Sequence, residues 1–195
     1  MEIVEFRPEM TEETAELLSR AFAQNPLHIA AFGMNSVIEK NKAFFRNGLV
    51  LFRGRRLVAV DGKRIIGFIH WVKSPECQFS WSQRLGLLPV MLYELGPGAT
   101  LRVSSWLSAW ANRDPKVTHW HLGPVGVEPD FQGKGIGRRL LDVYCSEIDH
   151  DRESGYLETD KPQNVEFYRK FGFEIVSEAL VIGVRTYFMT RTFSN

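Results

Sequence analysis

The chain has few cysteines, no excess of charge of either sign and no long apolar run. Its 195 residues include two cysteines, Cys77 and Cys145, which excludes a disulfide framework or a zinc ribbon. Lys and Arg number 24 and Asp and Glu 23, so the net charge of +1 creates no global field for nucleic acid, and no such partner is expected. No run approaches the roughly 18 apolar residues of a membrane-spanning helix, so no membrane partner is expected either.

The beginning of the chain also lacks the features of a secretory signal. Met1 is followed by the acidic segment 2–5 rather than by a basic region and an apolar one. We therefore predict a reduced, cytoplasmic protein. Hydrophobic residues make up 44% and charged residues 24%, a balance typical of globular proteins, and we expect residues 1–195 to form a single domain.

The first third of the chain predicts a mixture of strands and helices. Asp61-Gly62 between two β-rich runs is a strong hairpin signal. Acidic residues after Thr11 suit the positive end of a helix, and Pro26 is interpreted as the end of that helix. The predicted elements are a strand at 3–7, a helix from Thr11 to before Pro26, a helix over 36–52, and hairpin strands at 57–60 and 65–72.

Residues 74–116 interrupt this pattern and predict a helical insertion. Two apolar stretches within it, Leu85–Leu95 and Leu101–Ala111, are expected to be helices. Four tryptophans lie in or beside the insertion, namely Trp71, Trp81, Trp106 and Trp110. The insertion is interpreted as a roof over an apolar acceptor site, as the face of a homodimer, as a membrane-contacting surface, or as helices that simply pack on the sheet.

A glycine-rich turn, residues 132–138, leads into a helix predicted at about 135–153. Gly133, Gly135 and Gly137 let backbone N–H groups converge on a phosphate, and the beginning of the helix adds partial positive charge. These features predict an anion site. A glycine turn without any ligand is the alternative.

Two other phosphate-binding motifs do not fit this turn. A P-loop needs Ser or Thr after its Lys, whereas Gly135 follows Lys134. The dinucleotide fingerprint needs a third glycine where Arg138 stands and usually opens its fold, although Glu158 lies about 20 residues further on, as that fingerprint requires.

The second half of the chain predicts a β-α-β-α-β-β order and a mixed α/β sheet. The strand before the glycine turn, at 119–127, is interrupted by Gly123-Pro124, which indicates a bulge or a splayed strand because proline donates no ladder hydrogen bond. The remaining predicted elements are a strand at 156–159, a short helix at 164–170, and strands at 174–181 and 186–192.

At these residues the chain resembles the GNAT family of N-acetyltransferases. Gln132, Gly135 and Gly137 match the core of the family's acetyl-CoA motif. A second motif of the family is similar to Leu157-Glu158-Thr159, Pro162, Asn164, Phe167-Tyr168 and Phe171-Gly172-Phe173. With the ending Arg185–Arg191, this segment looks most like the puromycin N-acetyltransferase-like branch. The resemblance covers residues 117–191.

The resemblance implies a fold, a cosubstrate and a set of binding residues. The implied fold is a GNAT-type mixed, mostly antiparallel central sheet with a splayed strand, flanked by helices. The implied cosubstrate is acetyl-CoA. The residues implied to hold coenzyme A are Val125, Gly126 and Val127 along the pantetheine arm, Gln132, Gly133, Lys134, Gly135, Ile136, Gly137 and Arg138 at the pyrophosphate, and Asn164 facing the pantetheine or the mouth of the site.

The same resemblance points to catalytic candidates. Tyr168 matches the family's general-acid tyrosine, which implies that it protonates the leaving thiolate; the alternative is an aromatic ring that only packs. Glu158 is interpreted as a general base, a substrate anchor or a solvated carboxylate, and the residues alone leave these three open.

Two histidines lie on the predicted motif strand. His119 and His121 are two positions apart, hence on one face, where they either join a proton relay or are hydrogen-bonded within the sheet. Two histidines are too few for a metal site, and Cys77 and Cys145 have no partner spacing, so no metal is expected.

These observations predict an N-acyltransferase that moves acetyl from acetyl-CoA to an amine of a small molecule. The amine attacks the thioester directly in a ternary complex. The alternatives are a protein or peptide N-acetyltransferase and a non-catalytic acyl-CoA-binding module.

Overall fold

The computed structural model describes residues 1–51 and 53–193. The strands are β1 (Glu2–Glu5), β2 (Arg55–Asp61), β3 (Arg64–Lys73), β4 (His119–Val127), β5 (Ser154–Thr159), β6 (Glu174–Val181) and β7 (Val184–Arg191). The helices are α1 (Thr11–Ala21), α2 (Pro26–Phe32), α3 (Val37–Leu51), α4 (Trp81–Leu95), α5 (Pro97–Ala111), α6 (Ile136–Asp151) and α7 (Pro162–Arg169). Among the helices so described, none is both long and apolar enough to span a bilayer.

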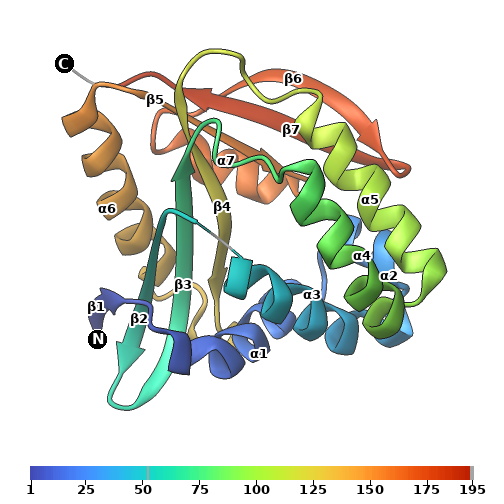
Figure 1. The fold of residues 1–195 in the computed structure, drawn as a ribbon. Helices are drawn as coiled ribbons and strands as arrows, with labels where there is room; N and C mark the ends of the chain where they lie inside the picture. The colour runs from blue at the N-terminus through green and yellow to red at the C-terminus, as the bar shows by residue number, and fades with distance from the viewer. Residues whose placement is uncertain (52, 194–195) are drawn as a thin grey trace.

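The strands form one seven-stranded sheet in the order β1-β2-β3-β4-β5-β7-β6 (Figure 1). Every neighbouring pair is antiparallel except β4 and β5, which are parallel. The predicted mixed, mostly antiparallel sheet is therefore confirmed. The hairpin predicted at Asp61-Gly62 joins β2 to β3, and Gly62 adopts a φ of +60° there.

The strand that contains Gly123-Pro124 separates from its neighbour, as the sequence predicts. Strands β4 and β5 pair only at the start of β4, from His119 opposite Ser154 to His121 opposite Tyr156. Beyond these positions both strands continue without pairing to each other. The register between β3 and β4 also shifts around Gly123-Pro124. A wedge thus opens between β4 and β5 in the centre of the sheet.

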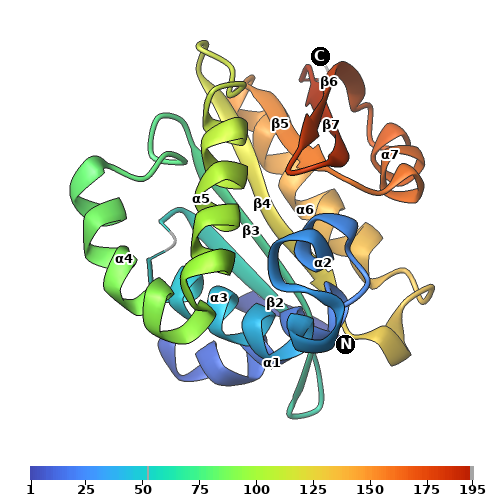
Figure 2. The same ribbon diagram turned by 90° about the vertical axis from the view of Figure 1, so that its right-hand side faces the viewer.

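Helices cover both faces of the sheet. Helices α6 and α7 pack on one face, where Leu57 of β2 joins Leu140 of α6 in a common core. The next residue along β2, Val58, points to the opposite face and packs with α1 and α3. This alternation is the period of two that a two-sided sheet requires. Figure 2 shows α4 and α5 on the same side as α1, α2 and α3.

The interpretation of Pro26 as a helix end is wrong in part. Helix α1 ends earlier, at Ala21, and Pro26 begins α2. Proline suits the first turn of a helix because its missing N–H would have no partner there and its φ is already helical. Helix α3 ends at Leu51, and Phe52, the last residue of the helix predicted over 36–52, lies outside the described residues.

The two helices predicted within residues 74–116 are confirmed as α4 and α5. Helix α5 shares a core with the sheet, because Val103 and Trp106 are buried in a cluster that includes Phe188 of β7. Helix α4 is more exposed, and Trp81 at its start is 81% accessible. The insertion therefore packs on the sheet through α5 and presents α4 outward.

An imidazole is buried among aromatic rings under these helices. His28 of α2 lies 4.9 Å from the Trp106 ring and 5.5 Å from the Phe45 ring, centroid to centroid, and its Nδ1 is 2.6 Å from Oδ1 of Asn41. Burial lowers the pKa of the His28 imidazole to about 4, although its contact with Asn41 acts in the opposite direction. The ring is neutral in the folded protein at pH 7.

This buried histidine makes stability depend on pH. In the unfolded chain its pKa is about 6.5, so between about pH 6.5 and pH 4 the unfolded state binds a proton that the folded state does not. We expect the free energy of unfolding to fall across this window as the pH drops, by about 3 kcal/mol in full at 1.36 kcal/mol per pKa unit. Urea unfolding at a series of pH values measures the slope. His28→Gln should be less stable at pH 7 but show a shallower slope, and an equal slope would contradict the assignment.

Candidate functional site

The glycine turn leads directly into the first turn of α6. Gly133 and Gly135 have φ angles of +75° and +80°, which L-residues with a side chain rarely adopt. Gly135 is the N-cap residue of α6, and as a glycine it offers no side chain to cap this end. The first N–H groups of the helix are thus presented without a side-chain cap from that position, the arrangement that favours an anion.

The other residues predicted to bind the pyrophosphate differ in which of their groups face the glycine turn. The side chain of Ile136 is buried in the core, so only its backbone faces the turn. Lys134 and Arg138 are exposed beside it, and the Lys134 ammonium lies 4.7 Å from the centre of the Phe131 ring. Gln132 turns back, and its Nε2 donates to the carbonyl oxygen of Val127 at 3.0 Å.

At the end of β4, the backbone groups on the side of the wedge have no pairing partner in β5. The N–H of Glu128 donates to the Ile66 carbonyl of β3 at 3.0 Å. Because backbone groups alternate along a strand, those of Val127 and Val125 point to the other side, where β5 has diverged. Gly126 between them has a packing reason, because a Cβ there would lie 2.5 Å from the Leu18 side chain of α1.

A cavity of about 350 Å³ lies beside the wedge. Its walls are mostly apolar and aromatic and come from α2, α3, α4, α5 and the open part of β4; they include Phe44, Phe45, Leu87, Met91, Trp106 and Val125. Polar residues line the same space, among them His28, His121, Glu158, Asp160, Asn164 and Tyr168. An apolar cavity with a few convergent polar groups is typical of a small-molecule site.

Tyr168 of α7 reaches this cavity from the opposite side to α4 and α5. Its ring packs against Phe167 and Phe173, with centroids 5.5 and 6.0 Å apart. Only 9% of the residue is exposed, and this burial raises the pKa of its hydroxyl above the ordinary value near 10. The hydroxyl therefore stays protonated at neutral pH.

Glu158 lies on β5 at the edge of the wedge, and its side chain is almost fully buried. Its Oε2 accepts a hydrogen bond from Nε2 of His121 at 3.0 Å, while its Oε1 has no hydrogen-bond partner among the described residues. The side chain is 2% exposed, so a solvated carboxylate, one of the three sequence interpretations, does not describe it. Thr159 is the residue after Glu158 on β5, and its Oγ1 accepts a hydrogen bond from Nδ2 of Asn164 at 3.2 Å.

The structure thus brings the predicted candidates Glu158, Asn164 and Tyr168 to one cavity. The residues of the glycine turn and of β4 that the sequence predicts to bind the donor lie at and beyond the open part of β4. The hydrogen bond between His121 and Glu158 has no signature in the sequence, because 37 positions separate the two residues.

Two further residues reach the histidines, and neither was expected. Asp114, just beyond α5, has Oδ1 3.1 Å from Nδ1 of His121 and 3.3 Å from Nε2 of His119. Cys77, between β3 and α4, has Sγ 3.5 Å from Oδ2 of Asp114. Burial lowers the pKa of His119, but its contacts with Asp114 and Cys77 outweigh burial and raise it to about 9. Burial raises the pKa of the Asp114 carboxyl, but both imidazoles outweigh this effect and lower it.

The sequence profile of the acetyltransferase (GNAT) domain matches residues 103–175, which include β4, the glycine turn, α6, β5 and α7. Mycothiol acetyltransferase of Propionibacterium freudenreichii subsp. shermanii is 44% identical over 59 residues, covering 27% of this chain and 18% of that protein. The chain therefore spans less than a fifth of the length of that curated relative.

Solved structures are similar over the whole chain. The crystal structure described as histone acetyltransferase HPA2 and related acetyltransferase from Corynebacterium glutamicum has a TM-score of 0.74 at 19% identity and covers 99% of this chain and 96% of its own. Arylalkylamine N-acetyltransferase 2 from Aedes aegypti has a TM-score of 0.68 at 13% identity, with 99% of each chain covered. At these identities the likeness establishes the fold, and the predicted fold class is confirmed.

Proposed function

We propose that this chain, whose residues 103–175 match the profile of the GNAT acetyltransferase domain, transfers acetyl from acetyl-CoA to the amine of a small molecule with an apolar body. One arrangement supports this above all others. An uncapped helix start with a glycine turn lies on one side of the wedge, and an apolar cavity containing a buried carboxylate and a buried tyrosine lies on the other.

The donor is proposed to lie along β4 and end at the glycine turn. The backbone groups of Val125 and the N–H of Val127 face the wedge and would pair with the amide groups of the pantetheine arm, as an added strand would, while the Val127 carbonyl oxygen already accepts from Gln132. The N–H groups from Gln132 to Arg138 then meet the pyrophosphate, with Lys134 and Arg138 adding positive charge. This places the thioester at the open end of the wedge, beside the cavity that Asn164 also lines.

The acyl transfer needs one proton removed and one proton supplied. An alkylamine with a pKa near 10.4 is protonated at pH 7, and its deprotonation costs about 4.6 kcal/mol at 1.36 kcal/mol per unit. The free amine nitrogen attacks the thioester carbonyl carbon, the amide bond forms, and the carbon–sulfur bond breaks. The ammonium releases its first proton to solvent before the attack, Glu158 receives the second proton from the nitrogen as the amide forms, and Tyr168 donates its hydroxyl proton to the leaving thiolate and regains one from solvent.

The acceptor is proposed to fill the roofed cavity. Its volume of about 350 Å³ suits a small ligand, and its aromatic walls suit an apolar body. The many apolar and aromatic side chains that α4 and α5 contribute to the lining favour an acceptor with an apolar body.

The insertion 74–116 is proposed to be this roof and part of the one domain of residues 1–195. The burial of Val103 and Trp106 against the sheet supports that organisation, because the insertion then shares a core with the strands. Of the interpretations left open by the sequence, a roof that also packs on the sheet agrees best with the cavity.

An amine panel tests the proposed function. Acetyl-CoA should raise the melting temperature whether the protein is an enzyme or only a binder, but only an enzyme releases free coenzyme A thiol when amines are added. We expect thiol release with apolar and aromatic alkylamines and little with peptides bearing free amines. Thermal stabilisation without thiol release across the panel would favour the non-catalytic alternative, and faster release with peptides would favour a protein acceptor.

A further inference from the structure

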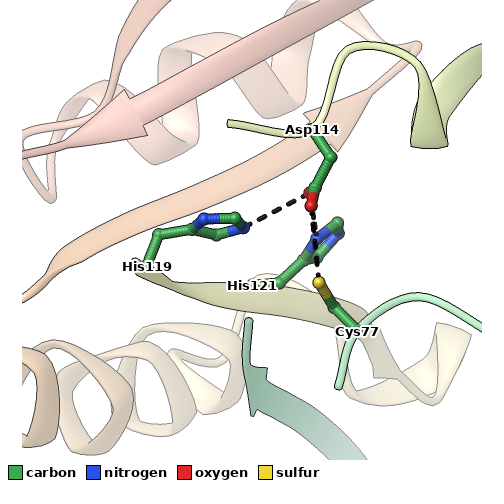
Figure 3. Close-up of side chains that lie close together, drawn as sticks. All are labelled: Cys77, Asp114, His119 and His121. Atoms are coloured by element: carbon green, nitrogen blue, oxygen red, sulfur yellow. Dashed lines mark hydrogen bonds and ion pairs between the residues drawn. The ribbon is translucent and has the colours of Figure 1, made fainter. Parts of the chain in front are cut away.

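Four potential metal ligands from three separate segments converge beside the cavity (Figure 3). One coordinating atom from each of Cys77, Asp114, His119 and His121 lies within 4.8 Å of all the others. We propose that these four residues form a tetrahedral Zn²⁺ site that ties both ends of the insertion 74–116 to β4. This departs from the expectation, drawn from the sequence, that the protein binds no metal.

The spacing of the four atoms is close to that of a zinc coordination shell. With zinc–ligand bonds of about 2.0–2.3 Å, the edges of a tetrahedron are roughly 3.3–3.8 Å. Oδ1 of Asp114 lies 3.3 Å from Nε2 of His119 and 3.1 Å from Nδ1 of His121. The other carboxylate oxygen, Oδ2, lies 3.5 Å from Sγ of Cys77. The four atoms all lie within 4.8 Å of one another, so side-chain rotations that shorten the longest separations would enclose one ion.

The outer contacts of His119 prepare it for coordination. Its Nδ1 is 2.8 Å from the carbonyl oxygen of Val117, and because a carbonyl only accepts, the proton lies on Nδ1. Its Nε2 then faces the cluster. The residue is 1% exposed, and Nε2 has no hydrogen bond among the described residues, although Asp114 lies at ion-pair distance. A buried imidazole nitrogen directed at a carboxylate in this way is placed to coordinate a metal ion that the same carboxylate would bind.

His121 is also oriented by a hydrogen bond from one ring nitrogen, which is Nε2 in this residue and Nδ1 in His119. Its Nε2 donates to Oε2 of Glu158, which leaves Nδ1 facing Asp114. Histidines that bind zinc almost always donate their second ring N–H to a carbonyl or a carboxylate, which sets the tautomer and raises ligand basicity. Val117 and Glu158 supply one partner of each kind.

The chemistry of the ligands selects zinc and a structural role. One thiolate, two imidazoles and one carboxylate form the mixed set of sulfur, nitrogen and oxygen ligands that Zn²⁺ accepts. All four positions are filled by protein, and structural sites are closed in this way, whereas catalytic zinc keeps a position open.

The place of the cluster in the fold explains what the ion would do. Cys77 precedes α4, and Asp114 follows α5, so the two residues bracket the helical roof. Both histidines belong to β4, the strand proposed to bind the donor. An ion at this point would hold the roof over the cavity and fix His121 against Glu158. Metal binding itself is measured without any acyl transfer, so the failure of this inference and of the proposed function are distinguishable.

Zinc binding to the full-length protein tests the inference directly. We expect metal analysis of the purified protein to give one zinc per chain. After removal with a chelator, added Zn²⁺ should raise the melting temperature and lower hydrogen exchange in residues 74–80 and 112–118. Co²⁺ should give the visible bands of a tetrahedral site and a thiolate-to-cobalt charge-transfer band.

Two ligand variants and one control locate the ion. Cys77→Ser should remove the charge-transfer band, and Asp114→Asn should weaken zinc binding by more than the roughly 10–100-fold that loss of an outer partner costs. Cys145→Ala, which changes the other cysteine within α6, should retain the full zinc affinity and the cobalt spectrum.

Two results would overturn the site. One is a stripped wild-type protein whose melting temperature and cobalt spectrum do not respond to metal, which would leave the cluster as an ion-paired hydrogen-bond network. The other is zinc binding that survives in Cys77→Ser and Asp114→Asn with wild-type affinity, which would place the ion elsewhere. The wild-type measurement needs no variant to fold.

Discussion

Tyr168→Phe is expected to lower kcat by about 100-fold or more, the lower end of what a positioned acid contributes, while the affinity for acetyl-CoA stays unchanged. The variant removes one oxygen atom and keeps the ring that packs against Phe167 and Phe173. Without the hydroxyl, the thiolate of coenzyme A, whose conjugate thiol has a pKa near 8.5 if it resembles a free cysteine, must leave unprotonated or wait for water. Steady-state kinetics with the best amine of the panel and calorimetric titration of acetyl-CoA give the two quantities.

Tyr144→Phe is the matched control for this experiment. Tyr144 of α6 is also fully buried, and its hydroxyl donates to the Trp120 carbonyl at 2.8 Å, but it does not line the cavity. The control should lose about 1 kcal/mol of stability and keep its turnover. Unchanged kcat in Tyr168→Phe would remove this residue from the mechanism, and an equal loss in both variants would assign the effect to general disturbance of the core.

Gly135→Val is expected to raise the Kd for acetyl-CoA by at least about 100-fold, because two charge-assisted hydrogen bonds of roughly 1.5 kcal/mol each would be lost from the pyrophosphate. Gly135 has a φ of +80°, and a Cβ added there meets no protein atom within 4 Å. The new side chain would therefore project into open space, in front of the uncapped N–H groups of α6. Titration calorimetry with acetyl-CoA measures the change.

Gly183→Val separates backbone strain from loss of the binding site. Gly183 joins β6 to β7 with a φ of +84°, and a Cβ there also meets nothing within 4 Å. Both variants should lose similar stability, since both force a β-branched residue into the left-handed region. Only Gly135→Val should lose acetyl-CoA affinity. Normal acetyl-CoA affinity in Gly135→Val, or an equal loss of affinity in Gly183→Val, would contradict the proposal that the glycine turn binds the pyrophosphate.

Most elements of the fold follow from signals that are local in the chain. Asp61-Gly62 predicts its hairpin because the turn chemistry lies within two residues. Gly123-Pro124 predicts the wedge because proline breaks the ladder where it stands. Pro26 misled the prediction because proline is found both after helices and in their first turn, and only the packing of α2 against α5 distinguishes the two cases.

The sequence by itself determined the donor side of the proposed site. The glycine turn, the helix that follows it and the segment around Tyr168 are each continuous in the chain, and they carry the resemblance to GNAT acetyltransferases, whose domain profile matches residues 103–175. Only the tertiary structure decided the rest. It lined a cavity with residues of α4 and α5, buried the Glu158 side chain against His121, and brought Cys77 and Asp114 to the two histidines. The physical reason is that periodicity and turn chemistry act over a few residues, whereas burial and coordination depend on segments that meet only after folding.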